Sequence, residues 1–268
     1  MKKVLTIAGS DSSGGAGIQA DLKTITAHGM YGMTAITALT AQNTTGVYDV
    51  LDSTPEFLGL QLDCIFKDIF PDAVKIGMVS SIPLINVIAD KLEEYKPKNI
   101  VLDTVMVSTS GSPLLQEDAI DTLKSRLIPL AHIITPNIPE AEILAGCEIK
   151  DLEDMKRVAR DLGKEYGCNV IVKGGHQRET ATDVLYDRNE DEIFIFRGER
   201  INNPNTHGTG CTLSSAIACN MAKELNLSKC IENAKKYLTS ALDYGLNLGK
   251  GSGPVNHCYN IGGNKNDL

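Results

Sequence analysis

The feature that most constrains the fold is a regular alternation of short apolar runs with longer segments of helical periodicity. Six runs have the length and composition of strands: Val4–Ala8, Thr34–Thr40, Ala73–Gly77, Asn99–Leu102, His132–Thr135 and Asn169–Lys173. The segments between them carry apolar residues at helical spacing: Gly17–His28, Pro55–Phe66, Ile82–Tyr95, Glu117–Arg126, and the pair Pro139–Leu144 and Leu152–Tyr166. This pattern predicts an α/β fold with a mostly parallel central sheet and helices on both faces.

The pattern changes after Lys173. Asp183–Tyr186 and Glu192–Arg197 flank a polar turn and predict a small antiparallel hairpin at the edge of the sheet. Two helices are expected to close the chain, and they cover Thr209–Leu225 and Ser228–Leu248. We expect one domain over residues 1–268, with a tail that is loose after Pro254 and in any case over about 258–268.

Composition excludes several classes of function. The formal net charge of -8 argues against nucleic acid as the main partner, because phosphate backbones are bound by basic surfaces. No apolar run approaches the roughly 18 residues of a membrane span, so no membrane association is expected. The seven cysteines show no zinc-ligand spacing and no C-x-x-C pair, which favours reduced thiols in the cytoplasm. A small-molecule substrate remains the natural partner.

The segment Asn205–Ala218 begins as a glycine loop and continues as a helix. Gly208 and Gly210 allow backbone amides to approach an oxyanion closely, and the helix start adds unsatisfied amides and a positive dipole end. Cys211 lies on the first turn, where that field is expected to favour the thiolate, so it is a potential base or nucleophile. The alternative is an ordinary helix start with a small buried cysteine.

In an open α/β sheet, ligands bind beyond the carboxyl ends of the strands, so the residues that follow each strand are candidates for a site. Gly9–Gly17 follows the first strand and leads into a helix that carries Asp21. The string Gly15–Ala20 matches a dinucleotide fingerprint only formally, because the strand ends too early and no acidic residue follows the second strand. The glycines are better suited to a tight wall against a small flat substrate, although a merely structural turn is the alternative.

The second and third strands end at Gln42 and at Met78. The amide of Gln42 offers a donor and an acceptor to the edge of a heteroaromatic ring, and the thioether of Met78 suits its face. A solvated glutamine and a core methionine are the alternatives for these two residues.

Charged residues follow the later strands. Asp103 suits Mg²⁺, which binds one or two carboxylates and keeps much of its water. Asn137 and Glu140 can face the same site, although their spacing is equally that of a capping box. Lys173 would bring a positive charge to a phosphate. An anion loop, carboxylates, a lysine and a candidate base at one sheet edge indicate phosphoryl transfer.

Seven segments in these positions also resemble a known family: Ala8–Asp21, Thr40–Thr44, Lys75–Met78, Leu102–Met106, Thr135–Ala141, Lys173–His176 and Asn205–Thr212. In order and spacing they resemble the ribokinase-like superfamily and, within it, the hydroxymethylpyrimidine/phosphomethylpyrimidine kinases of thiamine biosynthesis. The resemblance extends from the first strand to about His257.

The resemblance implies a ribokinase-like homodimer that uses ATP and Mg²⁺. It implies two phosphorylations, which convert 4-amino-5-hydroxymethyl-2-methylpyrimidine to its monophosphate and then to the diphosphate. By position, the pyrimidine would be held by Gly9, Asp21, Gln42, Met78 and Val105. The metal and its waters would be served by Asp103, Asn137 and Glu140. The ATP phosphates would be met by Lys173, Thr206, Gly208 and Thr209, with Gly208–Cys211 as the anion hole.

Cys211 stands where sugar kinases of this fold have an aspartate, so the sequence points away from sugars. As a general base the thiol needs a lowered pKa, which a helix N-terminus can supply. A pyridoxine/pyridoxal kinase on the same scaffold is the alternative enzyme, and a non-catalytic pyrimidine sensor is a second alternative. Thr44–Asp52 and Val105–Pro113 are both open as candidate lids.

Overall fold

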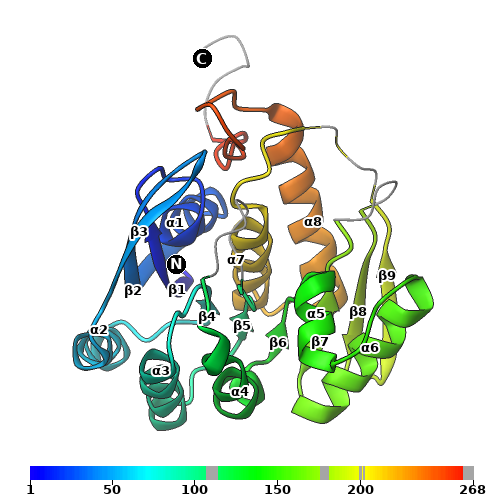
Figure 1. Cartoon of the computed structure of the whole chain (residues 1–268), viewed down its shortest axis with the longest axis horizontal. Helices are drawn as coiled ribbons and strands as arrows, with labels where there is room; N and C mark the ends of the chain where they lie inside the picture. Colours follow the sequence, from blue (N-terminus) through cyan, green and yellow to red (C-terminus); the bar gives the residue numbers. More distant parts are fainter. Residues whose placement is uncertain (107–113, 176–180, 199–200, 202, 262–268) are drawn as a thin grey trace.

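A computed structural model describes residues 1–106, 114–175, 181–198, 201 and 203–261. Within these residues nine strands form one sheet in the order β3-β2-β1-β4-β5-β6-β7-β8-β9 (Figure 1). The strands are β1 (Lys3–Asp11), β2 (Tyr31–Asn43), β3 (Gly46–Asp52), β4 (Ala73–Ile76), β5 (Ile100–Leu102), β6 (Ile133–Ile134), β7 (Asn169–Val172), β8 (Asp183–Asp187) and β9 (Glu192–Phe196). Pairs from β2 to β7 are parallel, whereas β3, β8 and β9 pair antiparallel with their neighbours. The expected mostly parallel sheet and its edge hairpin are confirmed.

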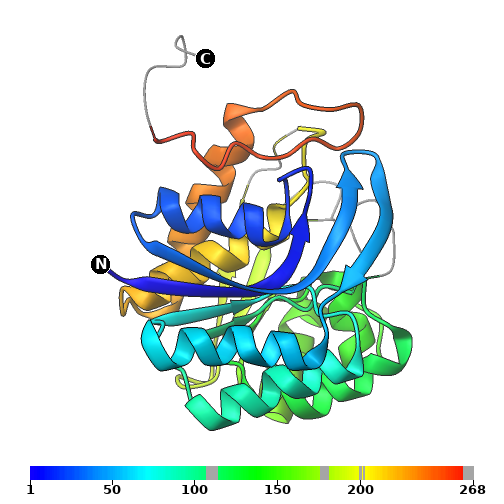
Figure 2. The ribbon, with the colours of Figure 1, turned by 90° about the vertical axis from the view of Figure 1, so that its left-hand side faces the viewer.

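Helices cover both faces of the sheet, as expected. They are α1 (Gly17–Ala27), α2 (Pro55–Asp68), α3 (Ile82–Tyr95), α4 (Ile120–Thr122), α5 (Ile138–Ala145), α6 (Leu152–Tyr166), α7 (Thr209–Ala222) and α8 (Leu227–Tyr244). Figure 2 shows α1, α7 and α8 on one side of the sheet, and α2 and α3 on the opposite side. The helix expected over Glu117–Arg126 is instead a succession of short turns, with α4 between a 3-10 turn (Glu117–Ala119) and a wide turn (Leu123–Leu127). No helix in the described parts of the chain has the length and apolarity needed to cross a membrane.

Alternation along β1 explains why the sheet needs covering on both sides. Leu5 and Ile7 point into the core shared with α2 and α3, whereas Val4 belongs to the core shared with α1, α7 and α8. Successive side chains of a strand point to opposite faces, so an apolar strand is stable only when both faces are buried.

Strand β3 was not expected from the sequence. It pairs antiparallel with β2 and forms the edge of the sheet opposite β9. Its residues are exposed or half-buried throughout. Its sequence also lacks the regular alternation of apolar and polar residues that indicates a half-buried strand. The candidate lid at Thr44–Asp52 therefore includes a paired edge strand. Most of the other candidate lid, Val105–Pro113, lies outside the described residues.

The expectation of a loose chain after Pro254 is wrong for residues 255–257. Val255, Asn256 and His257 are buried, and the His257 carbonyl accepts a hydrogen bond from the Tyr237 hydroxyl. Residues 262–268 lie outside the described part of the chain.

The segment before Pro254 braces two loops. The amides of Lys250 and Gly251 donate to the Thr44 Oγ1 at the β2–β3 turn, each at 3.2 Å. The His207 amide donates to the Gly253 carbonyl at 3.1 Å, next to the start of α7. The C-terminal segment thus links the edge hairpin to the glycine loop.

Candidate active site

The strand ends gather at the point where the sheet order reverses. The chain passes from β1 outward to β2 and then returns to β4 on the other side of β1, which is where open α/β sheets bind ligands. Helix α7 packs against β1, β4 and β5. Its amino terminus therefore meets the residues that follow these three strands.

Gly208 caps α7 in a conformation that requires glycine. Its φ is +80° and its ψ is 8°, in the left-handed region. A Cβ on Gly208 would also lie 1.8 Å from the carbonyl oxygen of Gly15 in the loop after β1. The two glycine-rich loops are thus in direct backbone contact, and any side chain at Gly208 would push them apart.

The turn presents unbonded amides. The Thr209 amide donates to the Thr206 carbonyl at 3.3 Å, and the Thr212 amide donates to the Gly208 carbonyl at 2.9 Å. Within the described residues, no hydrogen bond is made by the amides of Gly208, Gly210 and Cys211. Unpaired amides at the positive end of a helix are a ready site for an anion.

Lys173 and Asp103 lie beside this turn. A Cβ on Gly210 would be 3.5 Å from the Asp103 Oδ2 and 3.6 Å from the Lys173 Nζ. The Lys173 Nζ is 2.9 Å from the Asp103 Oδ1, and the two side chains are 15% and 2% exposed. Thr135 and Ser214 also donate to the Asp103 carboxylate, at 2.9 and 3.2 Å.

Charge keeps both groups of this pair ionised. Burial acts to raise the pKa of Asp103, but Lys173 and Lys75 more than offset it, and the pKa lies below its ordinary value. Burial acts to lower the pKa of Lys173, but Asp103 and Glu140 hold it above its ordinary value. A buried pair of this kind is stable because each charge has its partner and further hydrogen bonds.

Asn137 and Glu140 form the capping box of α5. The Asn137 Oδ1 accepts from the Glu140 amide, and the Glu140 Oε2 accepts from the Asn137 amide, both at 2.9 Å. The Glu140 Oε2 also accepts from the Thr104 hydroxyl at 3.1 Å, whereas its Oε1 has no hydrogen-bond partner among the described residues. Burial raises the pKa of Glu140. The capping box, which the sequence left as an alternative, is therefore present, and it leaves the Glu140 Oε1 for a ligand.

Asp21 accepts hydrogen bonds from three side chains around it. Its carboxylate is fully buried and accepts from the Lys75 Nζ at 2.8 and 3.0 Å, from Thr6 at 2.6 Å and from Ser215 at 2.7 Å. The resemblance places Asp21 against the pyrimidine, and this stays a prediction; each of the two carboxylate oxygens already accepts two hydrogen bonds. We assign the carboxylate to holding the Lys75 ammonium, whose pKa the pairing raises.

The expectation of a lowered pKa for Cys211 is wrong. Burial, with smaller contributions from the Asp21 and Asp103 carboxylates, raises the pKa of the thiol to about 11. Lys75 and a hydrogen bond from the Gly17 amide act in the opposite direction without prevailing. The helix terminus alone would favour the thiolate, but desolvation of a sulfur anion is the larger effect here. Its charged neighbours place the sulfur at the carboxyl edge of the sheet.

The remaining predicted residues lie around this centre. A Cβ on Gly9 would be 3.1 Å from the Met78 Sδ, so these two residues are in contact across β1 and β4. The Val105 amide donates to the Asp103 carbonyl at 2.8 Å, which keeps Val105 next to that carboxylate. Thr206 is exposed and Thr209 is half-buried on the turn itself. His176, the last residue of the lysine motif, lies outside the described residues.

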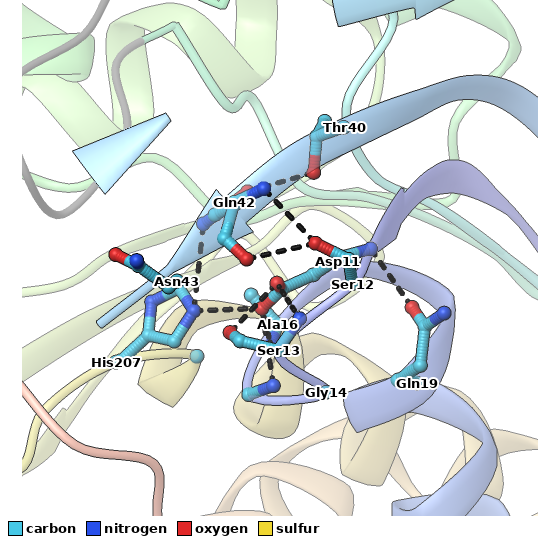
Figure 3. A network of polar contacts seen from close by, with 12 residues as sticks. Asp11, Ser12, Ser13, Gly14, Ala16, Gln19, Thr40, Gln42, Asn43 and His207 are labelled. Carbon is cyan, nitrogen blue, oxygen red and sulfur yellow. Dashed lines mark hydrogen bonds and ion pairs between the residues drawn. The ribbon is translucent and has the colours of Figure 1, made fainter. Parts of the chain in front are cut away.

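One network at this edge was missed (Figure 3). The buried His207 Nε2 lies 2.7 Å from the buried Asp11 Oδ2, and Gln42 lies against the same ring. A cavity of about 380 Å³ opens beside Gln42 and His207. The sequence D-x-S-G-G signals that Asp11 caps its own turn, but no local signal joins it to a histidine 196 positions away.

Solved structures share this fold. A phosphomethylpyrimidine kinase from Clostridium difficile matches with a TM-score of 0.81 and 47% identity, covering 90% of this chain and 99% of that one. A Bacillus subtilis pyridoxal kinase, solved as an ADP complex, matches with a TM-score of 0.88 and 38% identity, covering 96% and 98%. The sheet, the glycine turn and these neighbours define the class: the protein is a ribokinase-like kinase, and thus a phosphotransferase.

A family model of phosphomethylpyrimidine kinases matches residues 11–256, and the chain belongs to this family. The hydroxymethylpyrimidine/phosphomethylpyrimidine kinase of Escherichia coli is 46% identical over 264 residues, covering 96% of this chain and 98% of that protein. A thiamine biosynthesis bifunctional protein of Geobacter sulfurreducens is 49% identical over 255 residues, 95% of this chain. The chain spans 52% of that longer relative. The resemblance drawn from the motifs is confirmed.

Proposed function

We propose that this kinase transfers the terminal phosphate of ATP first to the hydroxyl of hydroxymethylpyrimidine and then to the resulting monophosphate, for thiamine biosynthesis. The observation that carries the proposal is the unbonded set of amides at Gly208, Gly210 and Cys211, beside Lys173 and Asp103. Such a turn stabilises charge that develops on a transferring phosphoryl group. The relatives are named for this substrate. The Gln42 carboxamide and the Met78 thioether suit a flat nitrogen ring.

The residues present fit Mg²⁺. Asp103 is an ionised carboxylate at the mouth of the turn, and Glu140 has one oxygen without a partner among the described residues. The Asn137 amide oxygen is already bonded within the capping box, so we assign the metal to the two carboxylates and to water. No cluster of three or more metal-ligating His, Cys, Asp or Glu side chains occurs in the described part of the chain, and Mg²⁺ does not need one. Bound there, the ion neutralises charge on the ATP phosphates.

A pyridoxal kinase activity is the second candidate, because a pyridoxal kinase matches the fold with a TM-score of 0.88. Both substrates are flat nitrogen rings that carry a hydroxymethyl group. An ATP-coupled turnover assay with each substrate in turn separates the two proposals, because specificity is the ratio of the kcat/KM values. We expect the higher kcat/KM for hydroxymethylpyrimidine, and a higher value for pyridoxal would overturn the assignment.

Cys211 is proposed as the base of the first transfer only. The first acceptor is an alcohol that must lose a proton, whereas the second acceptor is a phosphate that is already ionised. We expect Cys211→Ala to lower kcat of the first transfer by about a hundredfold or more and to leave the second transfer much less affected. Because the pKa of the thiol is about 11, only a small fraction of Cys211 is the thiolate at pH 7. The native rate of the first step should therefore rise from pH 7 to pH 9 as that fraction grows, and the variant should lose this rise.

Two separate assays measure this division, one starting from the alcohol and one from the monophosphate. Ser214→Ala removes a neighbouring hydroxyl that donates to Asp103 and serves as a comparison variant without loss of the thiol. Equal losses in both steps for Cys211→Ala would contradict the role of the sulfur as a base.

We also propose that the kinase is a cytoplasmic homodimer. All seven cysteines are free thiols, which suits a reducing compartment. Leu39 of β2 and Leu51 of β3 are opposite each other in the strand pairing and are 51% and 68% exposed. Exposed apolar patches of this kind mark protein interfaces. Light scattering of Leu39→Asp/Leu51→Asp should show a monomer if this edge forms the dimer, and an unchanged mass would place the interface elsewhere.

A further inference from the structure

The Asp11 carboxylate organises the loop after β1. Its Oδ1 accepts from the amide and the hydroxyl of Ser13, both at 2.8 Å. Its Oδ2 accepts from the amides of Gly15 and Ala16, at 3.0 and 2.9 Å. Burial acts to raise the pKa of Asp11, but hydrogen bonds from His207 and Ser13 lower it to about 2. The carboxylate is therefore an acceptor only at every working pH.

An ionised carboxylate determines which nitrogen of the histidine carries a proton. The Asp11 Oδ2 lies 2.7 Å from the His207 Nε2, and it can only accept. The His207 Nε2 must therefore be the donor. Gly15 packs on the same ring, because a Cβ there would lie 2.3 Å from the His207 Cδ2. The ring is thus held in place with its Nε2 toward the Asp11 carboxylate.

The protonated nitrogen has a consequence for Gln42. The Gln42 Nε2 lies 3.5 Å from the His207 Nε2, and its Oε1 accepts from the Thr40 hydroxyl at 3.0 Å. With a proton on the His207 Nε2, the first contact is between two donors and holds nothing. The donor of the carboxamide is left for an acceptor that the described residues do not supply. Figure 3 shows Gln42, His207 and Asp11 in this sequence of contacts.

We propose that Asp11 is a positioning residue for substrate recognition, which acts through the His207 Nε2 proton to keep the Gln42 carboxamide available to a ring nitrogen of the substrate. The inference rests on the proposed function for the nature of that ring. Whatever the ring is, a ligand at Gln42 must present a hydrogen-bond acceptor to the carboxamide. With an asparagine at position 11, one of the two acceptor oxygens becomes an NH₂ donor, so the His207 Nε2 would no longer be held as a donor and could accept from Gln42, which would close the site on itself.

Asp11→Asn tests this, because it keeps the size of the side chain and replaces one acceptor oxygen with a donor. We expect the KM for the pyrimidine to rise about tenfold, while the KM for ATP changes by less than about twofold. Heteronuclear NMR of the histidine ring nitrogens, assigned by comparison with His207→Asn, should show that the His207 Nε2 loses its proton in Asp11→Asn. Gln42→Ala should raise the same KM, and adding Asp11→Asn to it should raise the KM little further, because coupled residues are not additive.

Asp72→Asn is the matched control, since Asp72 also accepts from a backbone amide, that of Lys3 at 2.8 Å, but lies at the opposite end of the sheet. It should leave both KM values and the His207 signals unchanged. An unchanged Nε2 proton in Asp11→Asn, an equal rise in both KM values, or full additivity with Gln42→Ala would overturn the inference. Failure of the proposed function would appear differently, as a native enzyme that does not turn over the pyrimidine while the NMR comparison still reports on the proton.

Discussion

Gly208→Ala should lower kcat/KM for both transfers by at least about a hundredfold, because the substitution attacks the anion turn itself. Gly208 has a φ of +80°, and an alanine Cβ would lie 1.8 Å from the Gly15 carbonyl oxygen. The left-handed conformation costs an alanine about 1–2 kcal/mol, and the overlap must be relieved by moving one loop from the other. The amides of Gly210 and Cys211 would then no longer point at one phosphoryl group. Steady-state kinetics and thermal unfolding together measure the two effects.

Gly29→Ala is the matched control for this substitution. Gly29 has a similar φ of +72°, but a Cβ there would meet nothing within 4 Å. We expect a loss of stability of about 1 kcal/mol from the backbone strain alone, with kcat/KM unchanged. A Gly208→Ala enzyme that differs from native only as much as Gly29→Ala does would show that the contact between the loops is unimportant for catalysis.

Lys173→Met should lower kcat/KM by about a thousandfold through loss of the charge that we propose faces the phosphates. It should also destabilise the fold by about 3 kcal/mol, because it leaves the Asp103 carboxylate buried without its cation at 2.9 Å. Lys173 lowers the pKa of Asp103, and a lowered carboxyl pKa stabilises the fold at neutral pH. This contribution is lost as the pH falls through the folded pKa of Asp103. The stability difference between native and variant should therefore shrink below pH 3.8, the ordinary carboxyl value.

Lys91→Met is the comparison for that pair. Lys91 lies 2.7 Å from Asp63, and the two side chains are 20% and 21% exposed, on α3 and α2. Removing it should change kcat/KM by less than about twofold and lower stability by about 1 kcal/mol or less. Denaturant unfolding as a function of pH measures both variants. A Lys173→Met enzyme that keeps its kcat/KM would contradict the placement of the phosphates beside Lys173.

The strand ends were predictable because their signal is local. Asp103 and Lys173 each follow an apolar run, and parallel strands bring their carboxyl ends to one edge, so their proximity follows from the sheet alone. The capping box at Asn137 and Glu140 was predictable as one of two open alternatives, since it depends only on residues three apart.

Contacts between residues far apart in the sequence, and the burial that they produce, were not predictable. The Asp21 carboxylate is occupied by Lys75, which is 54 positions away, and the pKa of Cys211 depends on how far the sulfur is desolvated. Neither property has a counterpart in sequence spacing. The same limit applies to the contact between Asp11 and His207, and to β3, whose exposed side chains carry no pattern. Residues that act through distant partners need the assembled fold.

The turn before α7 is proposed to hold the transferring phosphoryl group with its backbone amides. A crystal structure with Mg²⁺, ADP, aluminium fluoride and hydroxymethylpyrimidine tests it most directly, because the fluoride mimics that group in transfer. We expect its fluorine atoms to accept hydrogen bonds from the amides of Gly208, Gly210 and Cys211, with Lys173 in contact and the pyrimidine hydroxyl in line. Aluminium fluoride bound away from this turn, with the three amides still unbonded, would contradict the claim.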